Sequence, residues 1–176
     1  MIQTNWYVIT GGPSSGKSKT IEYLAFLGHP TVPESARVLI DMHVNQGRSI
    51  KEIRADEKVF QRKILEMKID AEKKILPGQI TFFDRGIPDS LAYYRFFGDD
   101  TDPVLKACTV RKYKGVFLLD PLPFEHDYAR VENRETAITL HTLLDEAYTS
   151  LGYEVIRVPV MPISERAELI LSKIGK

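Results

Sequence analysis

Near the N-terminus stands the glycine-rich stretch Gly11-Gly12-Pro13-Ser14-Ser15-Gly16-Lys17-Ser18, which follows the apolar run 6–10 and precedes Lys19. The order indicates a strand, a tight loop and a helix. In this pattern backbone N–H groups wrap a diphosphate, the lysine reaches the outer phosphates and the last hydroxyl ligates Mg²⁺. Gly11 and Gly16 allow the phosphates to come close to the backbone, which a Cβ would prevent. The stretch predicts a site for ATP or another nucleoside triphosphate with Mg²⁺, and we expect it to be lined from Gly11 to Lys19.

The composition bounds the class of protein. With 176 residues, 43% hydrophobic and 27% charged, we expect residues 1–176 to form one domain with a sizeable core. Basic and acidic residues number 24 each, so nothing in the net charge favours nucleic acid or an anionic membrane as a partner. Cys108 is the single cysteine, which favours a reducing compartment. No apolar run approaches the roughly 18 residues of a membrane span, so we expect a cytoplasmic protein.

Five short runs rich in β-branched and aromatic residues alternate with helical stretches. They lie at 6–10, 31–32, 80–83, 115–119 and 154–158. This alternation is typical of an α/β fold, in which helices cover both faces of a parallel sheet. The runs at 80–83 and 116–119 are continuously apolar, which indicates central strands that are buried on both sides.

The longest helix that the sequence predicts starts at a capping box formed by Ser49 and Glu52 and ends at Leu76, before Pro77. Its apolar residues recur at helical spacing, and at about 1.5 Å per residue it would span roughly 40 Å. The apolar face fits either the core or the contact surface of a possible homodimer. A second helical stretch, 87–97, is rich in aromatic residues that suit a substrate pocket and an ordinary core equally well.

Charged residues follow the second and third predicted strands. Ligands of open α/β sheets gather at the carboxyl ends of the strands, where Glu34 follows 31–32 and Asp84-Arg85 follows 80–83. Asp84 is placed to hold Mg²⁺ together with Ser18. Arg85 stands where hydrolysing ATPases commonly place a water-activating glutamate, and a guanidinium neutralises phosphoryl charge rather than acting as a base. Glu34 is the better base for an acceptor hydroxyl. The alternative interpretation of Glu34 is an ordinary surface carboxylate at the start of a helix.

These residues resemble a known arrangement. The loop 11–18, Val32-Pro33-Glu34 and Phe82-Phe83-Asp84-Arg85 are similar to motifs of the deoxynucleoside kinases and of the ribosylnicotinamide kinase domain of NadR proteins, with their AAA-like ATPase relatives. The resemblance implies a three-layer P-loop NTPase fold with a sheet ordered 2-3-1-4-5. It also implies that Glu34 activates the acceptor and Arg85 contacts phosphate. Two departures from the deoxynucleoside kinases are Asp84, where they usually have glutamate, and Gly86, where they have serine.

The proline-bearing segment 120–134 follows the fourth predicted strand, and the resemblance places it as the lid that closes over ATP. Arg130 and Arg134 are the candidate catalytic arginines of this segment. The alternative interpretation is that each is a solvent-exposed charge on a loop without a catalytic role. The site as predicted therefore has Lys17, Glu34, Asp84, Arg85, Arg130 and Arg134 in catalytic roles.

The function that these expectations support is ATP- and Mg²⁺-dependent phosphoryl transfer to a hydroxyl of a small nucleoside- or riboside-like acceptor. Acceptor-independent ATP hydrolysis and a non-catalytic nucleotide-binding module are the alternatives. A regulatory GTPase normally carries an Asn-Lys-x-Asp segment, which this sequence lacks; the nearest candidate, Asn133-Arg134-Glu135-Thr136, does not serve.

Overall fold

The computed structural model describes residues 1–122 and 134–174. Its strands are β1 (Ile2–Gln3), β2 (Trp6–Thr10), β3 (Thr31–Val32), β4 (Thr81–Asp84), β5 (Arg111–Lys112), β6 (Gly115–Leu119) and β7 (Val155–Val158). Its helices are α1 (Lys17–Phe26), α2 (Ser35–Val44), α3 (Ile50–Ile53), α4 (Glu57–Lys73), α5 (Ile87–Phe97), α6 (Asp102–Cys108), α7 (Arg134–Ser150) and α8 (Ile163–Lys173). None of the helices in these described ranges is long and apolar enough to cross a membrane.

A parallel sheet of five strands forms the middle layer, in the order β3-β4-β2-β6-β7. Numbered among themselves along the chain, these strands follow the order 2-3-1-4-5 that the family resemblance implies. The predicted α/β fold class is confirmed. The structure adds a second, two-stranded parallel sheet of β1 and β5, which the sequence patterns did not predict. Ile2–Gln3 and Arg111–Lys112 are not runs of β-branched and aromatic residues, which is the signal that identified the other strands.

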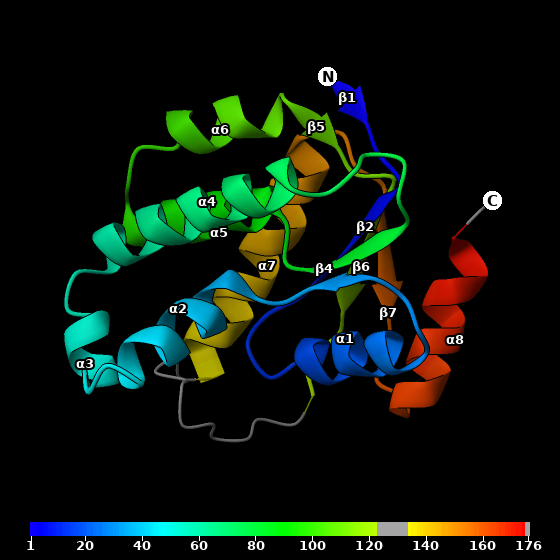
Figure 1. The fold of residues 1–176 in the computed structure, drawn as a ribbon, viewed down its shortest axis with the longest axis horizontal. Coiled ribbons are helices and arrows are strands. Elements are labelled where there is room, and N and C mark those ends of the chain that lie inside the picture. The colour runs from blue at the N-terminus through cyan, green and yellow to red at the C-terminus, as the bar shows by residue number, and fades with distance from the viewer. Residues whose placement is uncertain (123–133, 175–176) are drawn as a thin grey trace.

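Side chains of β2 alternate between the two faces of the sheet. Tyr7 and Ile9 pack into the cluster that α1 and α8 contribute, through residues such as Leu24 and Ile170. Trp6 and Val8 belong to the cluster on the opposite face. In Figure 1, α1 and α8 cover one face of the sheet and α4, α5 and α7 lie over the other. The central strand is therefore buried on both sides, as its apolar sequence predicts.

The prediction of a single long helix from Ser49 to Leu76 is wrong, because one helix ends at Ile53 and a new helix starts at Glu57. The capping box of Ser49 and Glu52 is present and begins only the short α3. Asp56 then caps α4, since its side chain accepts a hydrogen bond from the backbone N–H of Val59 at 3.0 Å. An aspartate at this position favours a new helix start over a continuous helix, so the longer helix α4 spans only about 25 Å.

The neighbouring strands β3, β4 and β2 end at the same edge of the sheet, because they are parallel. The segments that leave this edge are the glycine-rich loop after β2, the start of α2 after β3 and the turn between β4 and α5. The fold thereby brings together three segments that are far apart in sequence, at the edge where ligands of such sheets bind.

Candidate active site

The glycine-rich loop connects β2 to α1 in a conformation that needs its glycines. Gly11 has φ 145° and Gly16 has φ 78°, both in the region that favours glycine. A Cβ at Gly11 would lie 2.7 Å from the backbone oxygen of Leu119, and one at Gly16 would lie 2.9 Å from the guanidinium of Arg166. The loop is therefore packed tightly against β6 and α8, with no room for larger residues at these two positions.

Lys17, the first residue of α1, folds its side chain back over the loop. Its Nζ donates to the backbone oxygen of Gly12 at 2.9 Å and to Ser15 Oγ at 3.2 Å, and the side chain is buried. Burial and then the charge of Arg85 lower the pKa of Lys17 to about 8. An anionic group at the loop would relieve both effects, because it would pair with the desolvated ammonium.

Ser18 and Asp84 meet across the sheet edge. Ser18 Oγ donates to Asp84 Oδ2 at 3.1 Å, while the buried Oδ1 has no hydrogen-bond partner among the described residues. Burial, followed by the negative charge of Glu34, raises the pKa of Asp84 to about 7. A hydroxyl beside a carboxylate with an unused oxygen fits Mg²⁺, which prefers oxygen ligands and needs few from the protein. These two residues are therefore the ones that could hold the ion.

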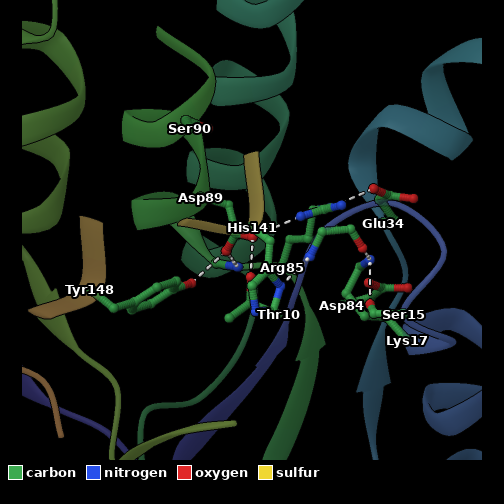
Figure 2. A network of polar contacts seen from close by, with 12 residues as sticks. Thr10, Ser15, Lys17, Glu34, Asp84, Arg85, Asp89, Ser90, His141 and Tyr148 are labelled. Atoms are coloured by element: carbon green, nitrogen blue, oxygen red, sulfur yellow. Dashed lines mark hydrogen bonds and ion pairs between the residues drawn. The ribbon is translucent and has the colours of Figure 1, made fainter. Parts of the chain in front are cut away.

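Arg85 occupies the turn after β4 and is almost fully buried. Its Nε donates to Glu34 Oε1 at 2.6 Å and its Nη1 to Asp89 Oδ1 at 3.1 Å, and its guanidinium lies 5.5 Å from the ring centre of Tyr93. Its φ of 70° is unusual for a residue other than glycine. Figure 2 shows the guanidinium between the carboxylates of Glu34 and Asp89, so its position is determined from two sides.

Glu34 stands at the N-cap of α2 but makes no capping hydrogen bond with its side chain. Burial alone would raise the pKa of Glu34, but the positive charges of Arg85 and Lys17 outweigh it and lower the pKa. The carboxylate is thus ionised at neutral pH. It faces the cluster and is no ordinary surface carboxylate at a helix start.

The structure brings Lys17, Ser18, Glu34, Asp84 and Arg85 to one edge of the sheet, where Figure 2 shows most of them in a single polar network. Lys19 is exposed on α1, and Arg134 is exposed at the first residue of α7. Within the described ranges, Arg134 makes no hydrogen bond or ion pair with Lys17, Ser18, Glu34, Asp84 or Arg85. Arg130 and most of the predicted lid segment, 123–133, lie outside the residues that the structure describes.

Two further residues that sequence reasoning missed contact the loop. His141 of α7 accepts a hydrogen bond at Nδ1 from the backbone N–H of Gly12 at 3.3 Å, and burial lowers the pKa of His141, which keeps this nitrogen available as an acceptor. Arg166 of α8 is buried and donates from Nη1 to the backbone oxygen of Ser15 at 2.7 Å. The available signal was an arginine directly before Ala167 on the apolar face of a helix.

The aromatic residues of α5 divide between the two environments that the sequence left open. Tyr94 is buried in the cluster that α5 forms with α4, α6 and α7. Tyr93 lies next to the guanidinium of Arg85. One helix therefore contributes both to the core and to the wall of the polar cluster.

Comparison with solved structures finds the same fold in proteins of low sequence identity. NadR protein in complex with NR has a TM-score of 0.72 and 14% identity, over 98% of this chain and 50% of the NadR chain. Deoxyadenosine kinase from M. mycoides, with products dCMP and a flexible dCDP bound, has a TM-score of 0.65 and 17% identity, over 97% of this chain and 98% of that chain. The chain thus spans half the length of NadR. At sequence identities this low, the structural similarity establishes a shared fold and nothing further.

No curated protein matches the chain in sequence. The family model described as "AAA domain" matches residues 6–166, a range that includes the glycine-rich loop, Glu34, Asp84 and Arg85. Because this match covers most of the chain, the protein belongs to the AAA domain family, and its P-loop fold is the one that nucleoside kinases also have.

Proposed function

We propose that the protein transfers the γ-phosphoryl group of ATP, bound with Mg²⁺, to a hydroxyl of a small nucleoside- or riboside-like acceptor. The observation that carries this proposal is the ion pair of Glu34 and Arg85, 2.6 Å apart, at the same sheet edge as Lys17 and Asp84. A carboxylate and a guanidinium beside a phosphate-binding loop supply what transfer to a hydroxyl needs: a proton acceptor and a counter-charge.

Each residue then has one role. The loop amides and Lys17 bind the phosphates, and Ser18 and Asp84 are the residues that would hold Mg²⁺, which supplies positive charge to the phosphate oxygens. Glu34 accepts the proton of the acceptor hydroxyl while the hydroxyl oxygen of the acceptor forms a bond to the γ-phosphorus. The bond from that phosphorus to ADP breaks as the new bond forms, and Arg85 offsets the developing charge. Arg130 and Arg134 stay predictions as lid residues.

The similar solved structures support this proposal. NadR has been solved with NR and also with NAD and AMP-PNP, and deoxyadenosine kinase with dCTP and with dATP. Both proteins thus bind nucleotides or related ligands, and each contains the fold that this chain has. An acceptor of the same general size and chemistry is therefore the first to test here.

Acceptor-independent hydrolysis and pure nucleotide binding are the competing functions. Measuring ADP release from ATP and Mg²⁺, with and without a panel of nucleosides and ribosides, separates all three. We expect release that depends on an acceptor. Release at the same rate without any acceptor would show an ATPase, and binding of ATP without release would show a binding module.

Replacing Asp84 by asparagine is expected to stabilise the nucleotide-free protein at pH 8. The pKa of Asp84 is raised from 3.8 to about 7, so its contribution to stability is present below pH 4 and is lost as pH rises through about 7. A neutral amide removes the cost of the buried charge, and we expect the Tm to rise by about 3 °C. The Mg²⁺ dependence of ATP binding should disappear in the same variant.

Thermal unfolding at pH 8, with and without ATP and Mg²⁺, measures both effects of Asp84→Asn. The exposed Asp70, which pairs with Lys73 on α4, provides the matched control Asp70→Asn. A lower Tm combined with full Mg²⁺-dependent stabilisation by ATP would contradict the role of Asp84.

Replacing Arg166 by methionine is expected to weaken ATP binding about 10-fold with little change in Tm. The substitution removes the hydrogen bond to Ser15 that shapes the loop. It also removes Nε and Nη2, which are buried without a partner among the described residues, and each such donor costs about 1–3 kcal/mol. The lost hydrogen bond lowers stability and the removed unpartnered donors raise it, so the Tm changes little. Nothing compensates for the altered shape of the loop, so ATP binding weakens.

Titration calorimetry with an ATP analogue and thermal unfolding measure the two effects of Arg166→Met. The control is Arg157→Met, because Arg157 is half-exposed on β7 and pairs with Asp145. Unchanged affinity, or a large loss of Tm without loss of affinity, would assign Arg166 to the core and not to the loop.

A further inference from the structure

Asp89, in the first turn of α5, is a completely buried carboxylate whose two oxygens are both in use. Oδ1 accepts from Thr10 Oγ1 at 2.6 Å and from Arg85 Nη1 at 3.1 Å. Oδ2 accepts from the backbone N–H of Gly86 at 2.9 Å and from the hydroxyl of Tyr148. The donors come from β2, from the turn after β4 and from α7, and they converge on Asp89 in Figure 2. Asp89 thus links β2, the turn after β4 and α7 through hydrogen bonds.

Helix capping explains only one of these four contacts. The hydrogen bond from Gly86 to Oδ2 is the capping-box contact at the start of α5, and one oxygen suffices for it. The other oxygen holds Arg85. A residue that served α5 alone would not need to face the guanidinium, so the second oxygen points to a role at the site.

Arg85 is shared between two carboxylates that differ in access. The Asp89 side chain is 0% exposed and the Glu34 side chain 20%. In the proposed reaction Glu34 must turn from Arg85 towards the acceptor hydroxyl. If Glu34 were its only partner, the buried guanidinium would then lose its counter-charge, which is costly. Asp89 stays in place, because its other hydrogen bonds do not involve Arg85 or Glu34.

We infer that Asp89 is a positioning residue for phosphoryl transfer: it fixes the guanidinium of Arg85 and carries its counter-charge while Glu34 binds the acceptor. This inference rests on the proposed function. It assigns to a residue outside the recognised motifs the task of keeping Arg85 aimed at the transferred group.

Replacing Asp89 by asparagine tests this inference directly. An amide has one acceptor oxygen in place of two, so either Arg85 or Gly86 then faces an N–H group. We expect kcat to fall about 100-fold, with the dissociation constant of ATP within about twofold. The matched control is Tyr148→Phe, which removes one donor to Asp89 but leaves its contact with Arg85 intact. Its kcat should stay within about threefold of the original protein.

A double variant separates positioning from general structural support. If Asp89 acts through Arg85, adding Asp89→Asn to Arg85→Lys should lower kcat by no more than about twofold beyond Arg85→Lys alone. Multiplying effects would overturn the inference. So would an unchanged kcat in Asp89→Asn, or an equal loss of kcat and ATP affinity.

A crystal structure of the Glu34→Gln protein tests the contact without any activity and without altering Asp89. We expect the guanidinium of Arg85 to remain on Asp89, and a guanidinium that leaves Asp89 would overturn the inference even if the asparagine variant does not fold. If the unmodified protein shows no acceptor-dependent transfer, the proposed function fails, while this structure still reports on the contact of Asp89 with Arg85.

Discussion

The Lys17→Met protein is expected to bind ATP at least about 100-fold more weakly and to lose phosphoryl transfer to below about one thousandth. The ammonium of Lys17 lies over the loop, 2.9 Å from the backbone oxygen of Gly12. It has neutral oxygens as its hydrogen-bond partners in the free protein. A triphosphate would replace these partners with charged oxygens, and such charge-assisted hydrogen bonds are about twice as strong.

The free Lys17→Met protein should also be more stable than the original at pH 7. Burial first, and then Arg85, lower the pKa of Lys17 from 10.5 to about 8, so the charged form costs stability in the folded state at neutral pH. That cost disappears as pH rises from about 8 towards 10.5. We therefore expect the difference in Tm between the two proteins to shrink over this range.

Calorimetric titration with ATP and Mg²⁺, with thermal unfolding from pH 7 to 10, measures both effects of the lysine substitution. Lys63→Met is the control, because Lys63 is exposed on α4 and pairs with Glu66. Full ATP affinity in the Lys17→Met protein would remove the glycine-rich loop from the proposed site.

The Glu34→Gln protein is expected to lose about 10²- to 10⁴-fold in the rate of transfer, the range that a general base contributes. Its ATP affinity should stay within about threefold, because the loop, Lys17 and Asp84 are unchanged. Glutamine keeps the shape and can still accept a hydrogen bond from Arg85, but it cannot take the proton of the acceptor hydroxyl.

Single-turnover kinetics with saturating ATP separates the transfer step from binding in the Glu34→Gln protein. Glu66→Gln is the matched control, since Glu66 is an exposed carboxylate on α4 that pairs with Lys63. Equal losses in affinity and in transfer, or no loss in either, would show that Glu34 is not the base.

Local patterns in the sequence predict the parts of this fold that depend on neighbouring residues. The glycine-rich loop and the central strand β2 need only a short stretch of chain to be recognised, and both form as expected. The strand order came from the family resemblance, because which strands lie side by side is decided by contacts that no single stretch contains. The break before α4 was missed because a continuous apolar stripe hid the capping aspartate, Asp56.

The candidate site shows the same division. Glu34, Asp84 and Arg85 could be proposed because each lies within two residues of the end of a predicted strand, and parallel strands end at one edge. His141 and Arg166 could not be proposed, because their contacts with the loop join residues 129 and 151 positions apart in the chain. Asp89 lies only four positions from Arg85, but its position also depends on Thr10, 79 positions away. Only the packing of α5, α7 and α8 against the sheet brings them to the loop and its neighbours.

The central claim is that a phosphate held by Lys17 meets an acceptor hydroxyl held by Glu34. The most direct measurement is to follow the γ-phosphorus of ATP by phosphorus NMR, in a mixture of the protein, Mg²⁺ and the panel of nucleosides and ribosides. We predict that the γ-phosphorus appears as a phosphate ester of one acceptor and that the ester forms at least about 100-fold more slowly with the Glu34→Gln protein. Appearance of the γ-phosphorus only as inorganic phosphate would contradict the claim.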